Sequence, residues 1–127
     1  MAKFRMVEGD IRNLETCRTA CKGADYVLHH ATLGSVPWSM DDPLRTNAVN
    51  VEGFVNIPVA SKDAGVKRFV YSSSSAVYGD TSDYPQVEER LGRPLSPYAG
   101  SRLEKANARS GSVTCFHHCG RPTTGLG

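Results

Sequence analysis

The sequence lacks the long apolar runs that would mark a membrane protein. No run in its 127 residues approaches the roughly 18 residues that a membrane helix needs. Residues 1–4 have no apolar core like that of a signal peptide. The net charge of +2, from 15 basic and 13 acidic residues, is too balanced for a dedicated nucleic-acid binder. We therefore expect one cytoplasmic domain, or part of one, with neither a membrane nor a nucleic acid as partner.

Cysteine is also scarce, because the chain has only four such residues. Cys17 and Cys21 share a helix face, whereas Cys115 and Cys119 flank two histidines. The paired C-x₂-C spacing of common zinc sites is absent. We therefore expect free thiols in a reducing compartment, no disulfide scaffold and no metal centre.

Short apolar runs alternate with segments of helical character along the chain. Strands are predicted at residues 4–7, 26–29 and 68–71, with a weaker one at 114–116, and residues 31–40 and 78–97 are predicted as loops. Helices are predicted at residues 14–21, from Asp41 or Asp42 to Gly65, and at residues 98–110. This order predicts the α/β fold class, with a parallel sheet and helices on both of its faces.

The longest predicted helix carries aliphatic residues at helical spacing. They are Leu44, Ala48, Val51, Val55 and Val59. Residues that recur at this interval share one side of a helix, so we expect them to form its buried face.

Three polar clusters follow predicted strands, namely Gly9-Asp10, His30-Ala31 and the serine run at residues 72–75. Ligands of doubly wound sheets bind at the carboxyl ends of the strands. We therefore expect the three clusters to meet at one edge of the sheet and to form a site there.

The sharpest chemical pair within these clusters is Ser74 and Tyr98. Arg102 lies four residues after Tyr98 and so shares its helix face. A phenol has a free pKa near 10, and acting as a base near pH 7 requires a shift of roughly three units. A neighbouring cation supplies part of that shift, and a serine hydroxyl can hold the substrate oxygen as its proton leaves.

Several motifs together resemble the extended short-chain dehydrogenase/reductase family, in its NAD-dependent epimerase/dehydratase branch. They are Gly9-Asp10-Ile11, His30-Ala31, Asn50-Val51-Glu52-Gly53, the block from Ser72 to Tyr78-Gly79, and Ser96-Pro97-Tyr98. Leu33-Gly34-Ser35-Val36-Pro37 and Pro94-Leu95 are most similar to the UDP-N-acetylglucosamine 4-epimerases of that family. The resemblance runs from about Phe4 to Tyr98.

The resemblance implies an isomerase that interconverts UDP-GlcNAc and UDP-GalNAc through a 4-keto intermediate, as in polysaccharide biosynthesis. The cofactor would be NAD, the substrate a UDP-sugar, and the full-length protein a homodimer. Catalysis would fall to Ser74, Tyr98 and Arg102. The implied cofactor contacts are Asp10, Ile11, Ala31, Thr32, Asn50, Ser72, Tyr98 and Arg102, and the implied substrate contacts are Gly34, Ser35, Ser74, Ser75 and Tyr98.

The sequence departs from the family pattern in two ways. Arg102 occupies the lysine position of the Tyr-x-x-x-Lys motif, and the two side chains are not interchangeable. No G-x-x-G-x-x-G turn occurs to hold a pyrophosphate. We therefore expect residues 1–127 to form a partial Rossmann-like, NAD(P)-binding domain that lacks the first βαβ unit and the C-terminal substrate domain. Residues 111–127 are a poorly matching tail, and the chain alone is expected to be inactive.

Two alternatives to an epimerase remain open from the sequence. One is a nucleotide-sugar dehydratase or reductase of the same family, although Ala76 follows the serines where dehydratases usually place an acidic pair. The other is a non-catalytic interaction module or remnant, which Arg102 and the absent glycine-rich turn favour.

Overall fold

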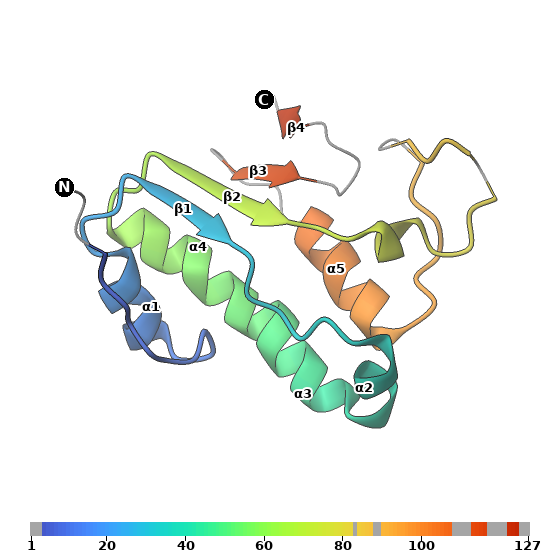
Figure 1. The fold of residues 1–127 in the computed structure, drawn as a ribbon, viewed down its shortest axis with the longest axis horizontal. Coiled ribbons are helices and arrows are strands. Elements are labelled where there is room, and N and C mark those ends of the chain that lie inside the picture. The colour runs from blue at the N-terminus through green and yellow to red at the C-terminus, as the bar shows by residue number, and fades with distance from the viewer. Residues whose placement is uncertain (1–3, 83, 88–89, 108–112, 117–121, 125–127) are drawn as a thin grey trace.

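The computed structural model describes residues 4–82, 84–87, 90–107, 113–116 and 122–124, with side chains as far as Arg102. Its elements follow one another as helices and strands around one small sheet (Figure 1). In chain order they are α1 (Leu14–Cys21), β1 (Tyr26–His29), α2 (Val36–Asp41), α3 (Pro43–Asn47), the π-helical turn η1 (Ala48–Glu52), α4 (Gly53–Asp63), β2 (Arg68–Ser72), the 3₁₀ turn η2 (Ser75–Tyr78), α5 (Pro97–Asn107), β3 (Val113–Phe116) and β4 (Pro122–Thr124).

The described strands form one sheet in the order β1-β2-β3-β4. β1, β2 and β3 are parallel, and β4 pairs antiparallel with β3. His29 pairs with Tyr71, so the carboxyl ends of β1 and β2 meet at one edge. This confirms the predicted α/β fold with its parallel strands, including the strand expected at 114–116.

The core lies between the sheet and helices α1 and α4. Its buried side chains are Cys17, Cys21, Phe54, Ile57, Ala60, Phe69 and Tyr71. Within it the ring centroids of Phe54 and Tyr71 are 5.1 Å apart, and the buried His29 ring lies 5.3 Å from that of Phe54. His29 is therefore a packing residue at the end of β1.

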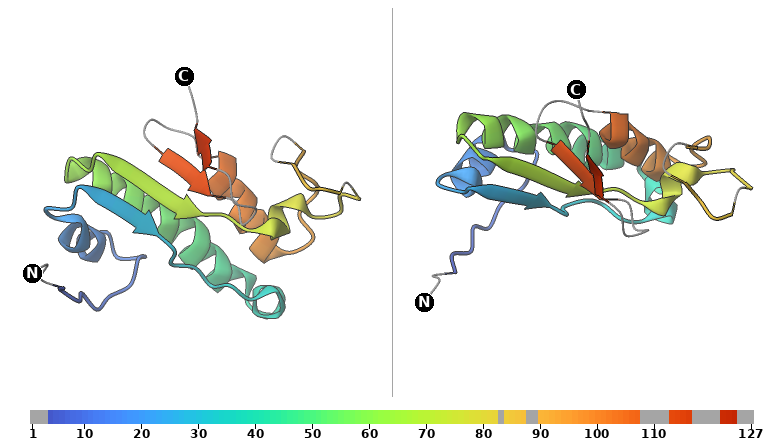
Figure 2. Two further views of the ribbon diagram at one scale, coloured as in Figure 1. Left: turned by 45° about the horizontal axis from the view of Figure 1, so that its top comes forward. Right: turned by 90° about the horizontal axis from the view of Figure 1, so that it is seen from above.

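The described helices lie on a single face of the sheet (Figure 2). On the other face Tyr26 and Leu28 of β1 are mostly exposed to solvent. Strand residues alternate between faces, so Val27 and His29 point toward α4 while Tyr26 and Leu28 do not. The expected second layer of helices is not seen among the residues that the structure describes.

Residues 43–63 form one long helical rod of α3, η1 and α4. The Asp42 carboxylate caps it by accepting from Arg45 N at 3.0 Å, and Gly65, with φ of +70°, follows its end. The predicted helix is thus confirmed, but its predicted buried face is wrong. Leu44 and Val55 are 82% and 51% exposed, respectively.

A different set of residues on this long helix faces the core. Apolar side chains occupy more than one side of the helix, so spacing alone did not identify the buried side. Phe54, Ile57 and Ala60 face the core, and Asn50 lies buried one turn before them. A π turn also adds a residue to the helical repeat, which shifts the phase of any pattern counted through it.

Two other local predictions are wrong. Residues 4–7 form no strand, and Phe4 and Met6 are exposed, because no strand among the described residues pairs with this segment. Within the predicted loop at 31–40, residues Val36–Asp41 form helix α2, since the Ser35 hydroxyl accepts from Trp38 N at 3.2 Å and caps it. None of the helices in the described ranges is both long and apolar enough to span a membrane.

Candidate active site

The carboxyl ends of β1 and β2 form a polar edge of the sheet, which we call the rim. Ser72 ends the strand, and Ser74 caps the turn η2 by accepting from Ala76 N at 3.2 Å. At the end of β1, His30 Nδ1 lies 2.5 Å from Ser72 Oγ. The two parallel strands therefore deliver polar side chains to one edge, as the strand-end rule predicts.

Tyr98 enters this rim from the first turn of α5. Its side chain is buried, with 9% of the residue exposed. Arg102, one turn further along, donates from Nε to Tyr98 Oη at 3.2 Å, and its guanidinium carbon lies 5.3 Å from the phenol ring centroid. Its Nη1 donates to Ser72 O at 3.3 Å, so one guanidinium group links the end of β2 to Tyr98 in the first turn of α5.

The environment of Tyr98 favours its ionised form. Burial raises the pKa of the phenol. Hydrogen bonds with Ser74 and Arg102, together with the positive charge of Arg102, outweigh burial and lower the pKa of Tyr98 below its usual value. Ser74, Tyr98 and Arg102, predicted from sequence as one site, are thus brought together by the structure.

The side chain of Asn50 connects the loop after β1 to α5 through hydrogen bonds. The side chain is fully buried, at 0% exposed. Its Oδ1 accepts from Thr32 Oγ1 at 2.9 Å and from Leu33 N at 2.8 Å. Its Nδ2 donates to Leu33 O at 3.1 Å and to Ser101 Oγ at 3.2 Å. Asn50 and Thr32, both predicted to contact the cofactor, are therefore engaged with the protein itself.

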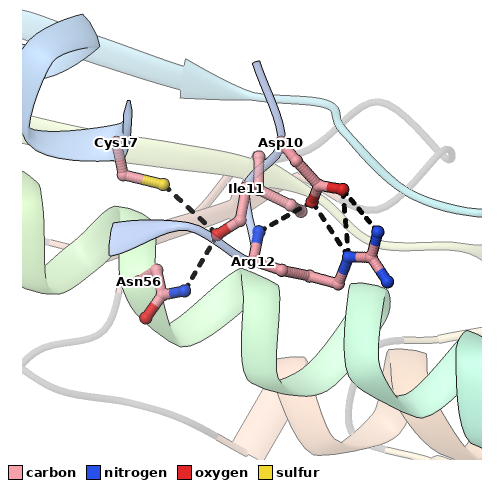
Figure 3. A network of polar contacts seen from close by, with 5 residues as sticks. All are labelled: Asp10, Ile11, Arg12, Cys17 and Asn56. Carbon is pink, nitrogen blue, oxygen red and sulfur yellow. Dashed lines mark hydrogen bonds and ion pairs between the residues drawn. The ribbon is translucent and has the colours of Figure 1, made fainter. Parts of the chain in front are cut away.

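Asp10 and Ile11, predicted to contact adenine, form a second polar cluster (Figure 3). Asp10 accepts from Arg12 at three nitrogens, the closest being Nη2 at 2.6 Å from Oδ2. These hydrogen bonds lower the pKa of Asp10 to about 2. Ile11 O accepts from Cys17 Sγ at 3.3 Å and from Asn56 Nδ2 at 2.9 Å, which fixes this segment against α1 and α4.

The remaining predicted residues lie along the loop after β1 and at the start of η2. Ala31 and Gly34 are exposed, Ser35 caps α2, and Ser75 is exposed at the first position of η2. Both buried cysteines of α1 are free thiols, as expected. The predicted helix end at 108–110 lies outside the described residues, and the side chains of the cluster at 115–119 lie outside those that the structure describes.

From the sequence, no individual role was assigned to two residues of the site. Ser73 is 7% exposed, and its hydroxyl has no hydrogen-bond partner among the described residues. Ser39 of α2 is fully buried, and its Oγ accepts from Tyr98 N at 3.1 Å. The serine run pointed to Ser73. No local signal marked Ser39, because its partner lies 59 residues away.

The fold and this rim define a Rossmann-like domain that places a tyrosine, a serine and a basic residue at its strand ends. The sequence pattern of the NAD dependent epimerase/dehydratase family matches residues 1–122. The chain belongs to this family.

Individual relatives agree with that assignment. UDP-glucose 4-epimerase of Streptomyces lividans is 38% identical over 98 residues, which cover 75% of this chain and 30% of the relative. The Mycolicibacterium smegmatis enzyme of the same name is 37% identical over 103 residues, covering 80% of this chain and 33% of its own length. The chain thus spans about a third of the length of these relatives.

Solved structures show the same architecture. UDP-N-acetylglucosamine 4-epimerase from Methanobrevibacter ruminantium M1, in complex with UDP-N-acetylmuramic acid, superposes with a TM-score of 0.70 at 34% identity, covering 80% of this chain and 34% of that one. UDP-glucose-4-epimerase from Stenotrophomonas maltophila, with bound NAD and formylated UDP-arabinopyranose, gives 0.73 at 33% identity and covers 77% and 30%. A dTDP-glucose 4,6-dehydratase from Streptomyces venezuelae gives 0.71 at 31% identity and covers 76% and 30%.

Proposed function

We propose that the rim of Ser74, Tyr98 and Arg102 is the acid–base centre of a nucleotide-sugar 4-epimerase that interconverts UDP-GlcNAc and UDP-GalNAc. The observation that carries the proposal is the Tyr98 phenol, buried between a serine hydroxyl and a guanidinium group that together lower its pKa. A base of this kind suits removal of a proton from the 4-hydroxyl of a sugar.

Each residue then has a definite task. Ser74 hydrogen-bonds the sugar hydroxyl, and Tyr98 accepts its proton as the 4-keto sugar forms. Arg102 stabilises the phenolate before the proton arrives. When the ketone is reduced at its opposite face, Tyr98 would give the proton back to the sugar oxygen.

NAD, when bound, supplies the hydride acceptor in this chemistry. The described residues suit its reacting end, because the buried Ser73 hydroxyl has no hydrogen-bond partner among them and Ala31 is exposed two residues after the end of β1. We assign that end to Ala31, Ser72 and Ser73, with Arg102 hydrogen-bonded to the backbone of Ser72. The residues do not suit the pyrophosphate of NAD, since the sequence holds no glycine-rich turn that could bind it. We therefore expect the 127-residue chain alone to be inactive.

The proposal is tested by a chimera in which residues 4–102 replace the matching segment of the Streptomyces lividans relative. We expect the chimera to convert UDP-GlcNAc to UDP-GalNAc, as followed by proton NMR of the anomeric signals. Tyr98→Phe should abolish conversion, whereas Tyr84→Phe, at an exposed loop position, should not change it.

Other outcomes separate the alternatives. Conversion of UDP-glucose but not of UDP-GlcNAc would refute the N-acetyl preference and retain the 4-epimerase. A keto-deoxy product would identify a dehydratase instead. A folded chimera that binds NAD but leaves every sugar unchanged would favour the non-catalytic interpretation.

Homodimer formation and a cytoplasmic location complete the proposal. Val55 and Val59 lie one turn apart on α4 and are 51% and 39% exposed, which supports self-association along this helix. Light scattering of the purified chimera measures the stoichiometry, and a monomer would refute the dimer.

A further inference from the structure

The hydroxyl of Ser39 is engaged on both sides. Its Oγ donates to Val36 O at 2.7 Å within α2 and accepts from Tyr98 N at 3.1 Å across to α5. The side chain is fully buried, so water does not compete for either bond.

The bond from Tyr98 matters because the first backbone N–H groups of a helix have no partner within it. Pro97, the first residue of α5, has no N–H. Ala99 N donates to Ser96 Oγ at 3.1 Å, and Gly100 N donates to Ser96 O at 2.9 Å. The N–H of Tyr98 is thus the one in this turn, among the described residues, whose partner comes from another element.

Ser39 lies on helix α2, which is itself held in place by hydrogen bonds. Ser35 caps α2 four residues before Ser39, and the loop leading into α2 is held by Asn50. Asn50 also binds Ser101, whose hydroxyl donates to Tyr98 O at 2.8 Å. The backbone of Tyr98 is therefore held at its N–H by Ser39 and at its carbonyl by Ser101.

We propose that Ser39 is a positioning residue for Tyr98, whose buried hydroxyl fixes the first turn of α5 so that the phenol meets Ser74 and Arg102. The inference rests on the proposed function only in that it treats Tyr98 as the base. Arg102 is the charged group that acts on the phenol, and Ser74 is its neutral partner. Displacement of the first turn weakens the contact of the phenol with Ser74, and unwinding of that turn weakens its contact with Arg102 as well, so the effect of burial on the pKa gains weight.

The test measures the phenol pKa in the full 127-residue chain by carbon-13 NMR of labelled tyrosine, with the signal assigned by Tyr98→Phe. We expect Ser39→Ala to raise the pKa of Tyr98 by about half a unit or more, the scale of one ordinary hydrogen bond. Ser39→Thr keeps the acceptor and should restore the native value. Ser61→Ala removes a buried hydroxyl from α4, away from α5, and should leave the pKa unchanged.

Two results would overturn the inference. One is a folded Ser39→Ala chain with the native Tyr98 pKa, and the other is an equal rise in Ser61→Ala. If Ser39→Ala does not fold, Ser39→Cys decides, because sulfur is a weak acceptor: a higher pKa than in Ser39→Thr supports positioning, and equal values refute it. The measurement needs no turnover, so an inactive chimera would refute the proposed function without touching this result.

Discussion

Replacement of Arg102 by glutamine is the most direct probe of the site. Glutamine keeps a hydrogen-bond donor but loses the positive charge that acts on Tyr98. The guanidinium Nε lies 3.2 Å from the phenol oxygen. A hydrogen bond to a charged group contributes about 1.5–3 kcal/mol, and one pKa unit corresponds to 1.36 kcal/mol. We therefore expect Arg102→Gln to raise the pKa of Tyr98 by about one to two units.

Coulomb's law gives a consistent lower bound. At this separation two unit charges interact by about 1.3 kcal/mol in a medium as polarisable as water, or about one pKa unit. The assay is a carbon-13 NMR titration of tyrosine-labelled chains. Arg102→Lys keeps the positive charge on a shorter side chain, so it should raise the pKa of Tyr98 less than Arg102→Gln does. Native and Arg102→Gln chains that titrate together would refute the idea that Arg102 lowers the pKa of the base.

Three further predictions concern folding. Asn50→Leu removes the four hydrogen bonds of a fully buried amide and should lower the free energy of unfolding by about 2–4 kcal/mol in urea, while Asn47→Leu at an exposed site should change it little. Phe54→Ala should cost about 3–5 kcal/mol, whereas Val55→Ala should stay within about 0.5 kcal/mol, and equal costs would contradict the buried face described above. The pKa of Asp10 is about 2 in the folded chain against 3.8 ordinarily, so its stabilisation is present above pH 4 and is lost as pH falls through 2. Asp10→Asn should therefore lower Tm near neutral pH, with the difference disappearing in acid and shrinking in high salt.

The part of the site that sequence predicted depends on short-range rules. Tyr98 and Arg102 share a helix face because they are four residues apart, and Ser74 follows a strand whose end must lie at the sheet edge. These rules hold whatever the rest of the chain does, and the structure brings the three side chains together accordingly.

The parts that sequence missed depend on long-range choices. The long helix has apolar residues on more than one side, so periodicity could not tell that Phe54 rather than Val55 faces the sheet. Asp10 was expected at the sheet edge after a strand, but residues 4–7 form no strand, and its carboxylate is engaged by a salt bridge with Arg12 that is set by side-chain geometry. Ser39 could not be found from the sequence, since its short segment, Val36–Asp41, carries no sign of the backbone amide of Tyr98 that the hydroxyl binds.

The charge balance of the rim gives a physical reason for the state of Tyr98. Arg102 is 6% exposed, and among the side chains that the structure describes no carboxylate forms an ion pair with it. A buried cation without a counter-charge is costly, because the attraction of dipoles such as Ser72 O replaces only part of its lost hydration. Its nearest group able to become an anion is the phenol that its Nε already contacts. Ionisation of Tyr98 would therefore create the missing counter-ion, and the penalty of burying Arg102 favours the form of the tyrosine that accepts a proton.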